Sequence, residues 1–164
     1  MKKIIYLLLA ATFANSTFAA DNYSIYLVRH AEKQKDGKNP SLTHCGQARA
    51  KQLASLLSQA NISQIYSTKY QRTRQTANPL ATKQHIAVQN YNPSHLEQLA
   101  IQLQQRKENS LVVGHSNTTP QLAELLSTQR MAPLTELDYQ QLYQIQFIGE
   151  AKIVTLFRQP LICH

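Results

Sequence analysis

Short apolar runs alternate along the chain with longer stretches in which apolar residues recur at helical spacing. Near-continuous apolar runs predict four strands, at residues 24–28, 64–67, 86–91 and 110–114. Helical spacing between and after them predicts four helices, at about residues 43–60, 71–83, 93–103 and 119–128. Two more strand-like runs, 142–148 and 152–157, flank Gly149-Glu150-Ala151, which is typical of a hairpin turn.

This order of elements predicts an α/β fold in three layers. Strands that alternate with helices favour a mostly parallel central sheet flanked by helices. The C-terminal hairpin should add at least one antiparallel strand at an edge. The sequence contains no internal repeat and no long linker, so we expect a single domain.

Three side chains bear on where the helices begin or bend. Thr43 is a good N-cap for the first helix. Pro79 is a candidate break or kink in the second helix, and Pro93 suits the first turn of the third. The expected apolar faces carry Leu53, Leu56, Leu57 and Ala60 in the first helix, and Leu96, Leu99, Ile101 and Leu103 in the third.

The first residues differ in character from the rest. Lys2 and Lys3 precede an apolar run and then small and polar residues, the layout of a secretory signal peptide. Small residues at Thr17 and Ala19 favour cleavage after Ala19, ahead of the alternative after Ala20. An uncleaved anchor fits less well, because spanning a bilayer takes roughly 20 apolar residues. We therefore expect a cleaved signal at 1–19, a single domain at 20–164, a periplasmic or secreted location, and no stable membrane insertion after cleavage.

The amino-acid composition excludes few classes of protein. The chain is 43% hydrophobic and 16% charged, as expected for a globular protein, and carries a net charge of +8. A basic balance suits acidic ligands, but no compact Lys/Arg block marks a nucleic-acid site, and we expect no nucleic-acid partner. The sequence leaves open whether Cys45 and Cys163 form a disulfide.

Candidate chemistry gathers where the predicted strands end. Arg29 and His30 follow the first strand, Arg72 comes soon after the second, and His115 follows the fourth. Ligands of open α/β sheets bind beyond the carboxyl ends of the strands, so these side chains could converge there. Each residue alone would more often be structural or exposed, and only their common position favours a site.

This set of residue types suits phosphoryl transfer. Arginine forks match the oxygens of a phosphoryl group and remain charged at any working pH. A neutral imidazole can attack phosphorus and form a covalent phosphohistidine. A second, protonated imidazole can donate to a phosphoryl oxygen, and such a site needs no metal or other cofactor.

Four segments carry recognisable motifs: Leu27 to Lys33, Pro40 to Ala50, Thr68 to Ala77 and Val112 to Pro120. Together they resemble the histidine phosphatase superfamily, also called phosphoglycerate mutase-like. The first segment resembles the family's Arg-His-Gly signature, with Ala31 in place of glycine. The others resemble the start of the family's first helix, its Arg-x-x-Gln-Thr-Ala block and its second-histidine motif.

The resemblance implies a role for each residue. His30 would be the phosphorylated nucleophile, Arg29 and Arg72 would bind phosphate, and His115 would complete the pocket. Ser116, Asn117 and Thr118 could contact substrate or orient His115. Many relatives also have a carboxylate that protonates the leaving oxygen, but this chain has none after its third strand or directly after His115. Glu32 is the nearest candidate general acid; Asp36, Glu97 and Asp138 are weaker ones.

The sequence therefore predicts an exported phosphomonoesterase, a metal-independent histidine phosphatase, acting on a small-molecule or glycolipid phosphate ester. A non-catalytic protein that binds phosphate or anionic glycolipid in the envelope is the main alternative. A zinc hydrolase using His30, His115 and Glu32 ranks last, because two flanking arginines disfavour a cation. Natural substrate and oligomeric state are not readable from the sequence.

Overall fold

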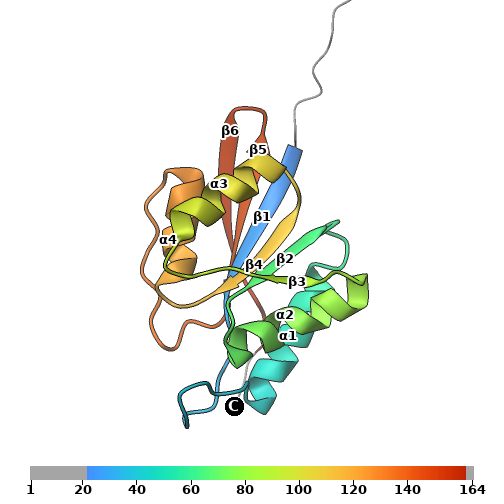
Figure 1. Ribbon diagram of the computed structural model, residues 1–164, viewed down its shortest axis with the longest axis vertical. Helices are drawn as coiled ribbons and strands as arrows, with labels where there is room; N and C mark the ends of the chain where they lie inside the picture. The colour runs from blue at the N-terminus through green and yellow to red at the C-terminus, as the bar shows by residue number, and fades with distance from the viewer. Residues whose placement is uncertain (1–21, 162–164) are drawn as a thin grey trace, which may run out of the picture.

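The computed structural model describes residues 22–161 and shows a three-layer α/β fold (Figure 1). The elements follow one another as β1 (Asn22–Arg29), α1 (His44–Leu56), β2 (Gln64–Ser67), α2 (Gln71–Gln84), β3 (Val88–Asn90), α3 (Leu96–Arg106), β4 (Ser110–Gly114), α4 (Thr118–Ser127), β5 (Gln141–Ile148) and β6 (Ala151–Arg158). The fold class expected from the sequence is confirmed.

One six-stranded sheet has the order β3-β2-β4-β1-β5-β6. Strands β1 to β4 are parallel to one another, whereas β5 pairs antiparallel with β1 and β6 antiparallel with β5. The C-terminal hairpin expected from the sequence is therefore present, and it contributes two strands rather than only an edge. In register, Arg29 of β1 lies opposite Gly114 of β4.

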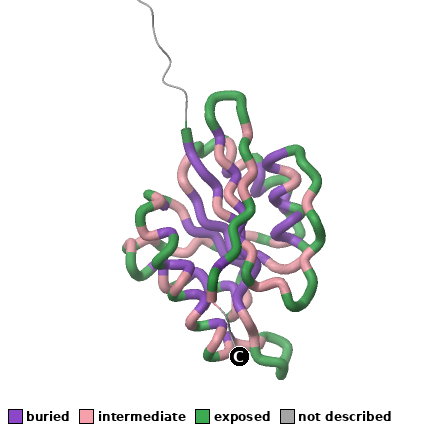
Figure 2. The backbone as a smooth tube through the Cα atoms, turned by 180° about the vertical axis from the view of Figure 1, so that it is seen from behind, coloured by how far each residue is buried: buried purple, intermediate pink, exposed green. Residues whose placement is uncertain are grey.

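Each face of the sheet packs against one pair of helices. Alternate side chains of β1 point to opposite faces, so Ile25 and Leu27 join the cluster with α3 and α4, and Val28 joins the cluster with α1 and α2. Figure 2 shows the central strands as the most buried part of the chain. Two apolar residues expected in the core are in fact half exposed or more: Leu56 at 50% and Ile101 at 58%.

Pro79 does not break its helix, whereas Pro93 does not start the next one as expected. Helix α2 continues through Pro79 to Gln84, because Ala77, Leu80 and Ala81 around it are buried against the core. Helix α3 begins at Leu96 rather than at Pro93. Asn92 explains this late start, since its side-chain and backbone oxygens accept from the amides of Ser94 and His95 and form a turn.

Some expectations concern residues that are not described. The signal peptide expected at 1–19 and Cys163 lie outside residues 22–161. Cleavage after Ala19 therefore stays a prediction, and the question of a Cys45–Cys163 disulfide stays as the sequence left it. In the part that is described, no helix is long and apolar enough to cross a membrane.

Helix α1 is fastened to the segment that follows β1. Thr43 is its N-cap, and its hydroxyl accepts from the Gly46 amide at 3.0 Å. The Glu32 carbonyl accepts from the Thr43 amide at 2.9 Å and lies so close to Gly46 that an added Cβ would be 2.2 Å from it. Position 46 therefore has no room for a side chain.

We expect Gly46→Ala to destabilise the protein. Alanine normally stabilises a helix relative to glycine by about 0.5–1 kcal/mol. Here the clash is with fixed backbone, and overpacking costs about 1–3 kcal/mol, so the clash should prevail. Urea unfolding of Gly46→Ala beside Gln47→Ala, an exposed neighbour on the same helix, measures the difference; a stabilised Gly46→Ala would contradict this account.

Candidate active site

The pairing of β1 with β4 brings the two histidines together. His30 and His115 each follow directly on one of these strands, and the His30 amide donates to the Gly114 carbonyl at 2.9 Å. Their rings are 5.6 Å apart between centroids, edge to face. Two residues 85 positions apart in the chain thus lie side by side at the carboxyl edge of the sheet.

His30 is oriented by its own backbone. Its Nδ1 lies 2.8 Å from the Ala31 carbonyl, which can only accept, so Nδ1 carries the proton and Nε2 keeps its lone pair. Burial, together with the nearby Arg29, Arg72 and His115, lowers the pKa of His30 from 6.5 to about 3, against the opposing effect of the Ala31 hydrogen bond. At neutral pH the ring is therefore uncharged and Nε2 is available as a nucleophile.

His115 is held between a hydroxyl and a guanidinium. Its Nδ1 lies 3.4 Å from Arg72 Nη2 and accepts from it, which leaves Nε2–H to donate to Thr68 Oγ1 at 3.1 Å. Burial, Arg72 and Arg29 lower the pKa of His115 to about 4. The expectation of a protonated His115 is thus wrong for the protein alone, because a buried site with two arginines disfavours a third cation.

Both arginines are stacked on tyrosine rings. Arg29, 3% exposed, lies 4.3 Å from the centre of the Tyr139 ring, and Arg72 lies 4.5 Å from that of Tyr70. The Nε atoms of both arginines are buried without a hydrogen-bond partner in residues 22–161. Unsatisfied buried cationic donors are costly, and an anion is the ligand that would satisfy them.

A cavity of about 370 Å³ opens over this cluster. All four residues placed here from the sequence line it, and so do Ser116, Asn117 and Thr118. The full lining is Arg29, His30, Lys33, Tyr70, Arg72, Pro93, Ser94, His115, Ser116, Asn117, Thr118 and Glu136. Thr118 also orients the second histidine, because its hydroxyl accepts from the His115 amide at 2.9 Å.

Glu32, the general acid expected first, is not among these residues. Its carboxylate is bound by Arg49, whose Nε lies 2.9 Å from both oxygens and whose Nη2 lies 2.5 Å from one of them. Arg49 is itself 3% exposed, so this is a bidentate, largely buried ion pair that fastens α1 to the β1 end. The weaker candidates Asp36 and Asp138 do not line the cavity either, and Asp138 instead accepts from Thr135.

Sequence reasoning missed the residues from outside the motifs. Glu136 and Tyr139 come from the loop between α4 and β5, which carries no recognisable pattern. Lys33 and Tyr70, which lie inside two of the recognised segments, were also missed. Their positions, one after Glu32 and two before Arg72, could have pointed to them. In residues 22–161 no cluster of three His, Cys, Asp or Glu side chains could hold a metal, which leaves the zinc alternative without a ligand set there.

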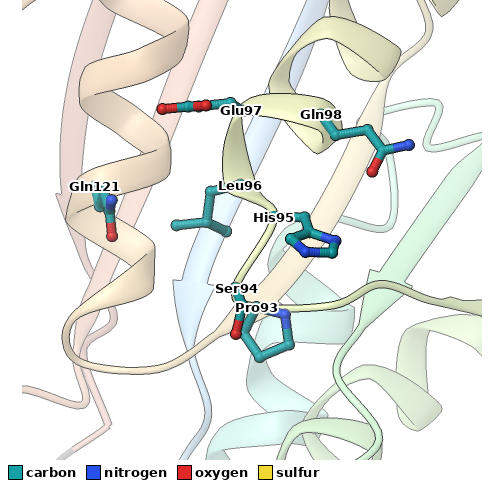
Figure 3. Close-up of a pocket in the computed structure, with 7 residues that line it drawn as sticks. All are labelled: Pro93, Ser94, His95, Leu96, Glu97, Gln98 and Gln121. Atoms are coloured by element: carbon teal, nitrogen blue, oxygen red, sulfur yellow. The ribbon is translucent and has the colours of Figure 1, made fainter.

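A second cavity, of about 500 Å³, adjoins the first at Pro93 and Ser94. Figure 3 shows its wall, made by the β3–α3 loop and the first turn of α3, with Leu96 and Glu97 on the side that faces Gln121 of α4. Apart from Pro93 and Leu96 its lining is polar: Ser94, His95, Glu97, Gln98 and Gln121. The two cavities together give the site one end lined by arginines and histidines and a wider polar extension.

The family model of the histidine phosphatase superfamily (branch 1) matches residues 25–92, which include Arg29, His30 and Arg72. The fold around these residues agrees with that match. Over residues 25–92 the chain therefore resembles the histidine phosphatase superfamily.

Solved structures share the fold at low sequence identity. The protein histidine phosphatase SixA in complex with tungstate has a TM-score of 0.66 and 11% identity, covering 82% of this chain and 96% of that one. A mycobacterial glucosyl-3-phosphoglycerate phosphatase has a TM-score of 0.64 and 11% identity, covering 84% and 98%. The SixA protein of Agrobacterium tumefaciens has a TM-score of 0.61 and 19% identity, covering 82% and 97%. No curated protein matches the sequence.

The two histidines should make the protein sensitive to acid. Their pKa values in the folded chain, about 3 and about 4, lie below the 6.5 of an unperturbed histidine, so the unfolded state binds protons first. Their stabilisation is complete above about pH 6.5 and is lost as the pH falls towards 4, at up to about 1.4 kcal/mol per pH unit for each. Urea unfolding from pH 7 to 4.5 should show a shallower loss for the double variant His30→Gln/His115→Gln than for wild type. Parallel losses in the two proteins would contradict the assigned pKa values.

Proposed function

We propose that this protein is an exported phosphomonoesterase that works through a phosphohistidine on His30. One observation carries the proposal: the His30 Nε2 lone pair is fixed and unprotonated in a cavity that also holds two arginines and a second histidine. Nucleophile and positive charge are the two things that phosphoryl transfer requires of a protein. The motif resemblance to a family of phosphatases supports the same reaction.

The geometry supports a two-step reaction. A phosphate dianion would be held by Arg29 and Arg72, with the neutral His115 and nearby hydroxyls completing the cradle. His30 Nε2 forms a bond to phosphorus while the bond to the ester oxygen breaks and its electron pair leaves with the alkoxide oxygen. That oxygen takes a proton from an acid of the site or from water and departs as the alcohol. Water then attacks phosphorus, the N–P bond breaks, and inorganic phosphate and neutral His30 are released.

The substrate would be a phosphate ester with a polar organic part. Beyond Ser94 the neighbouring cavity offers amide, imidazole and carboxylate groups, which suit the hydroxyls of a sugar or a polar headgroup. A small-molecule or glycolipid phosphate ester fits this shape. We place the enzyme in the periplasm or outside the cell because of its signal-like N-terminus.

The alternative, a protein of the envelope that binds phosphate or anionic glycolipid without turnover, rests on the missing acid in the usual positions. The lowered pKa of His30 weighs against it, since a site built only to hold an anion would gain from a protonated histidine. Hydrolysis of an aryl phosphate, whose leaving group needs little protonation, separates the two functions.

We predict that His30→Ala abolishes turnover of p-nitrophenyl phosphate, because no other nucleophile lies at the end of β1. Rapid quench of the wild-type mature chain with labelled substrate in alkaline denaturant should trap a base-stable, acid-labile adduct on His30. His44→Ala, at an exposed position on α1, is the matched control and should behave as wild type. Label on a serine, a cysteine or a carboxylate would refute the mechanism.

We also predict that activity needs no metal, since Arg29 and Arg72 supply the positive charge that a metal would otherwise provide. Enzyme treated with a strong chelator and dialysed should retain its rate on p-nitrophenyl phosphate, and vanadate should inhibit competitively. A chelated enzyme that is inactive until zinc or magnesium is added would show that a metal hydrolase mechanism operates instead.

A further inference from the structure

Glu136 places a carboxylate in the active site from a loop that the family motifs do not include. Its Oε2 lies 2.9 Å from Arg29 Nη2, and its Oε1 lies 3.4 Å from the Ser116 hydroxyl. It is the one acidic residue among the described residues that line the catalytic cavity. Glu136 thus stands next to both a phosphate-binding arginine and the segment that follows His115.

Two other carboxylates close to the catalytic cavity, those of Glu32 and Asp138, have structural partners. Glu32 is bound on two sides by Arg49, and protonating it would leave that buried guanidinium without its counter-charge. Asp138 accepts from both the amide and the hydroxyl of Thr135, which shapes the turn that carries Glu136. Neither is free to exchange protons with a substrate.

Glu136 has the freedom that such an exchange requires. Its side chain is 71% exposed, and the loop between α4 and β5 that carries it has no helix or strand. The backbone of this loop is anchored separately, because the Thr135 carbonyl accepts from Arg29 Nη1 at 2.6 Å. The carboxylate can therefore leave Arg29 while the loop stays in place beside the cavity.

A bound phosphate would change the surroundings of Glu136. Phosphate is the stronger partner for a guanidinium fork and would compete with the carboxylate for Arg29 Nη2. Once displaced, the carboxylate no longer has Arg29 as its counter-ion and lies beside the bound phosphate. Proton uptake from solvent is open to a side chain this exposed.

We propose that Glu136 is the proton-transferring residue of this site, a role that rests on the proposed phosphatase function. In the first step the Glu136 acid gives its proton to the ester oxygen as the P–O bond breaks and the N–P bond to His30 forms. In the second step the Glu136 carboxylate takes a proton from the water whose oxygen attacks phosphorus. The N–P bond then breaks, its electron pair returns to Nε2, and Glu136 is again the acid.

The test is the dependence of kcat/KM on the leaving group, measured with substituted phenyl phosphates on wild type and Glu136→Gln. Proton donation matters most for poor leaving groups, so Glu136→Gln should lose about 10²-fold or more on phenyl phosphate and only a few-fold on a dinitrophenyl phosphate. Glu150→Gln, in the turn between β5 and β6, removes the same charge away from the site and should retain the wild-type series.

A second readout follows the water step. With a good leaving group, Glu136→Gln should show a burst of phenolate release and accumulate labelled phosphohistidine, because its second step lacks the base. A uniform loss across the series would make Glu136 only a positioning residue, and a uniform gain with tighter phosphate inhibition would make it only a competitor for Arg29. Either result overturns this proposal, whereas a wild type that is inactive on every ester overturns the phosphatase function itself.

Discussion

The parallel pairing of β1 with β4 is the contact on which the site depends. Register sets Arg29 opposite Gly114, and the His30 amide extends the same ladder by donating to the Gly114 carbonyl. A shift by one residue would turn each side chain of β1 to the other face of the sheet. Both helix pairs bury apolar residues of β1, so the core that stabilises the fold also fixes the position of His30.

Several cationic or protonatable groups in one buried cluster repel one another, and three features of the structure offset this repulsion. Both histidines are neutral at pH 7, because burial and the arginines lower their pKa values. Tyr139 and Tyr70 present their rings to the two guanidinium groups, and Glu136 supplies a counter-charge to Arg29. The histidines then remain available to an anion without competing with the arginines for it.

The sequence predicted what is set by local pattern. Strands β1 and β4 are apolar runs that end in polar residues. From this pattern in the sequence alone, Arg29, His30 and His115 could be assigned to one edge of the sheet. Arg72 followed from its position after β2. The prediction that the third helix begins at Pro93 was wrong, because a turn formed by Asn92 delays the start of α3 to Leu96. The ion pair of Glu32 with Arg49 could not be predicted from the sequence either, because Arg49 comes close to Glu32 only when α1 packs beside the end of β1.

Glu136 marks the limit of such prediction, and the reason is physical. A residue at a strand end inherits its place from the sheet, whereas one in the long loop before β5 takes its place from contacts that form only in the folded chain, here with Arg29 and Ser116. The division also suits the proposed reaction. Phosphate binding requires groups that do not move, and the strand ends and the start of α2 supply them. Proton transfer to leaving groups of different size and position benefits from a carboxylate on a mobile side chain, and a loop can supply it without disturbing the sheet.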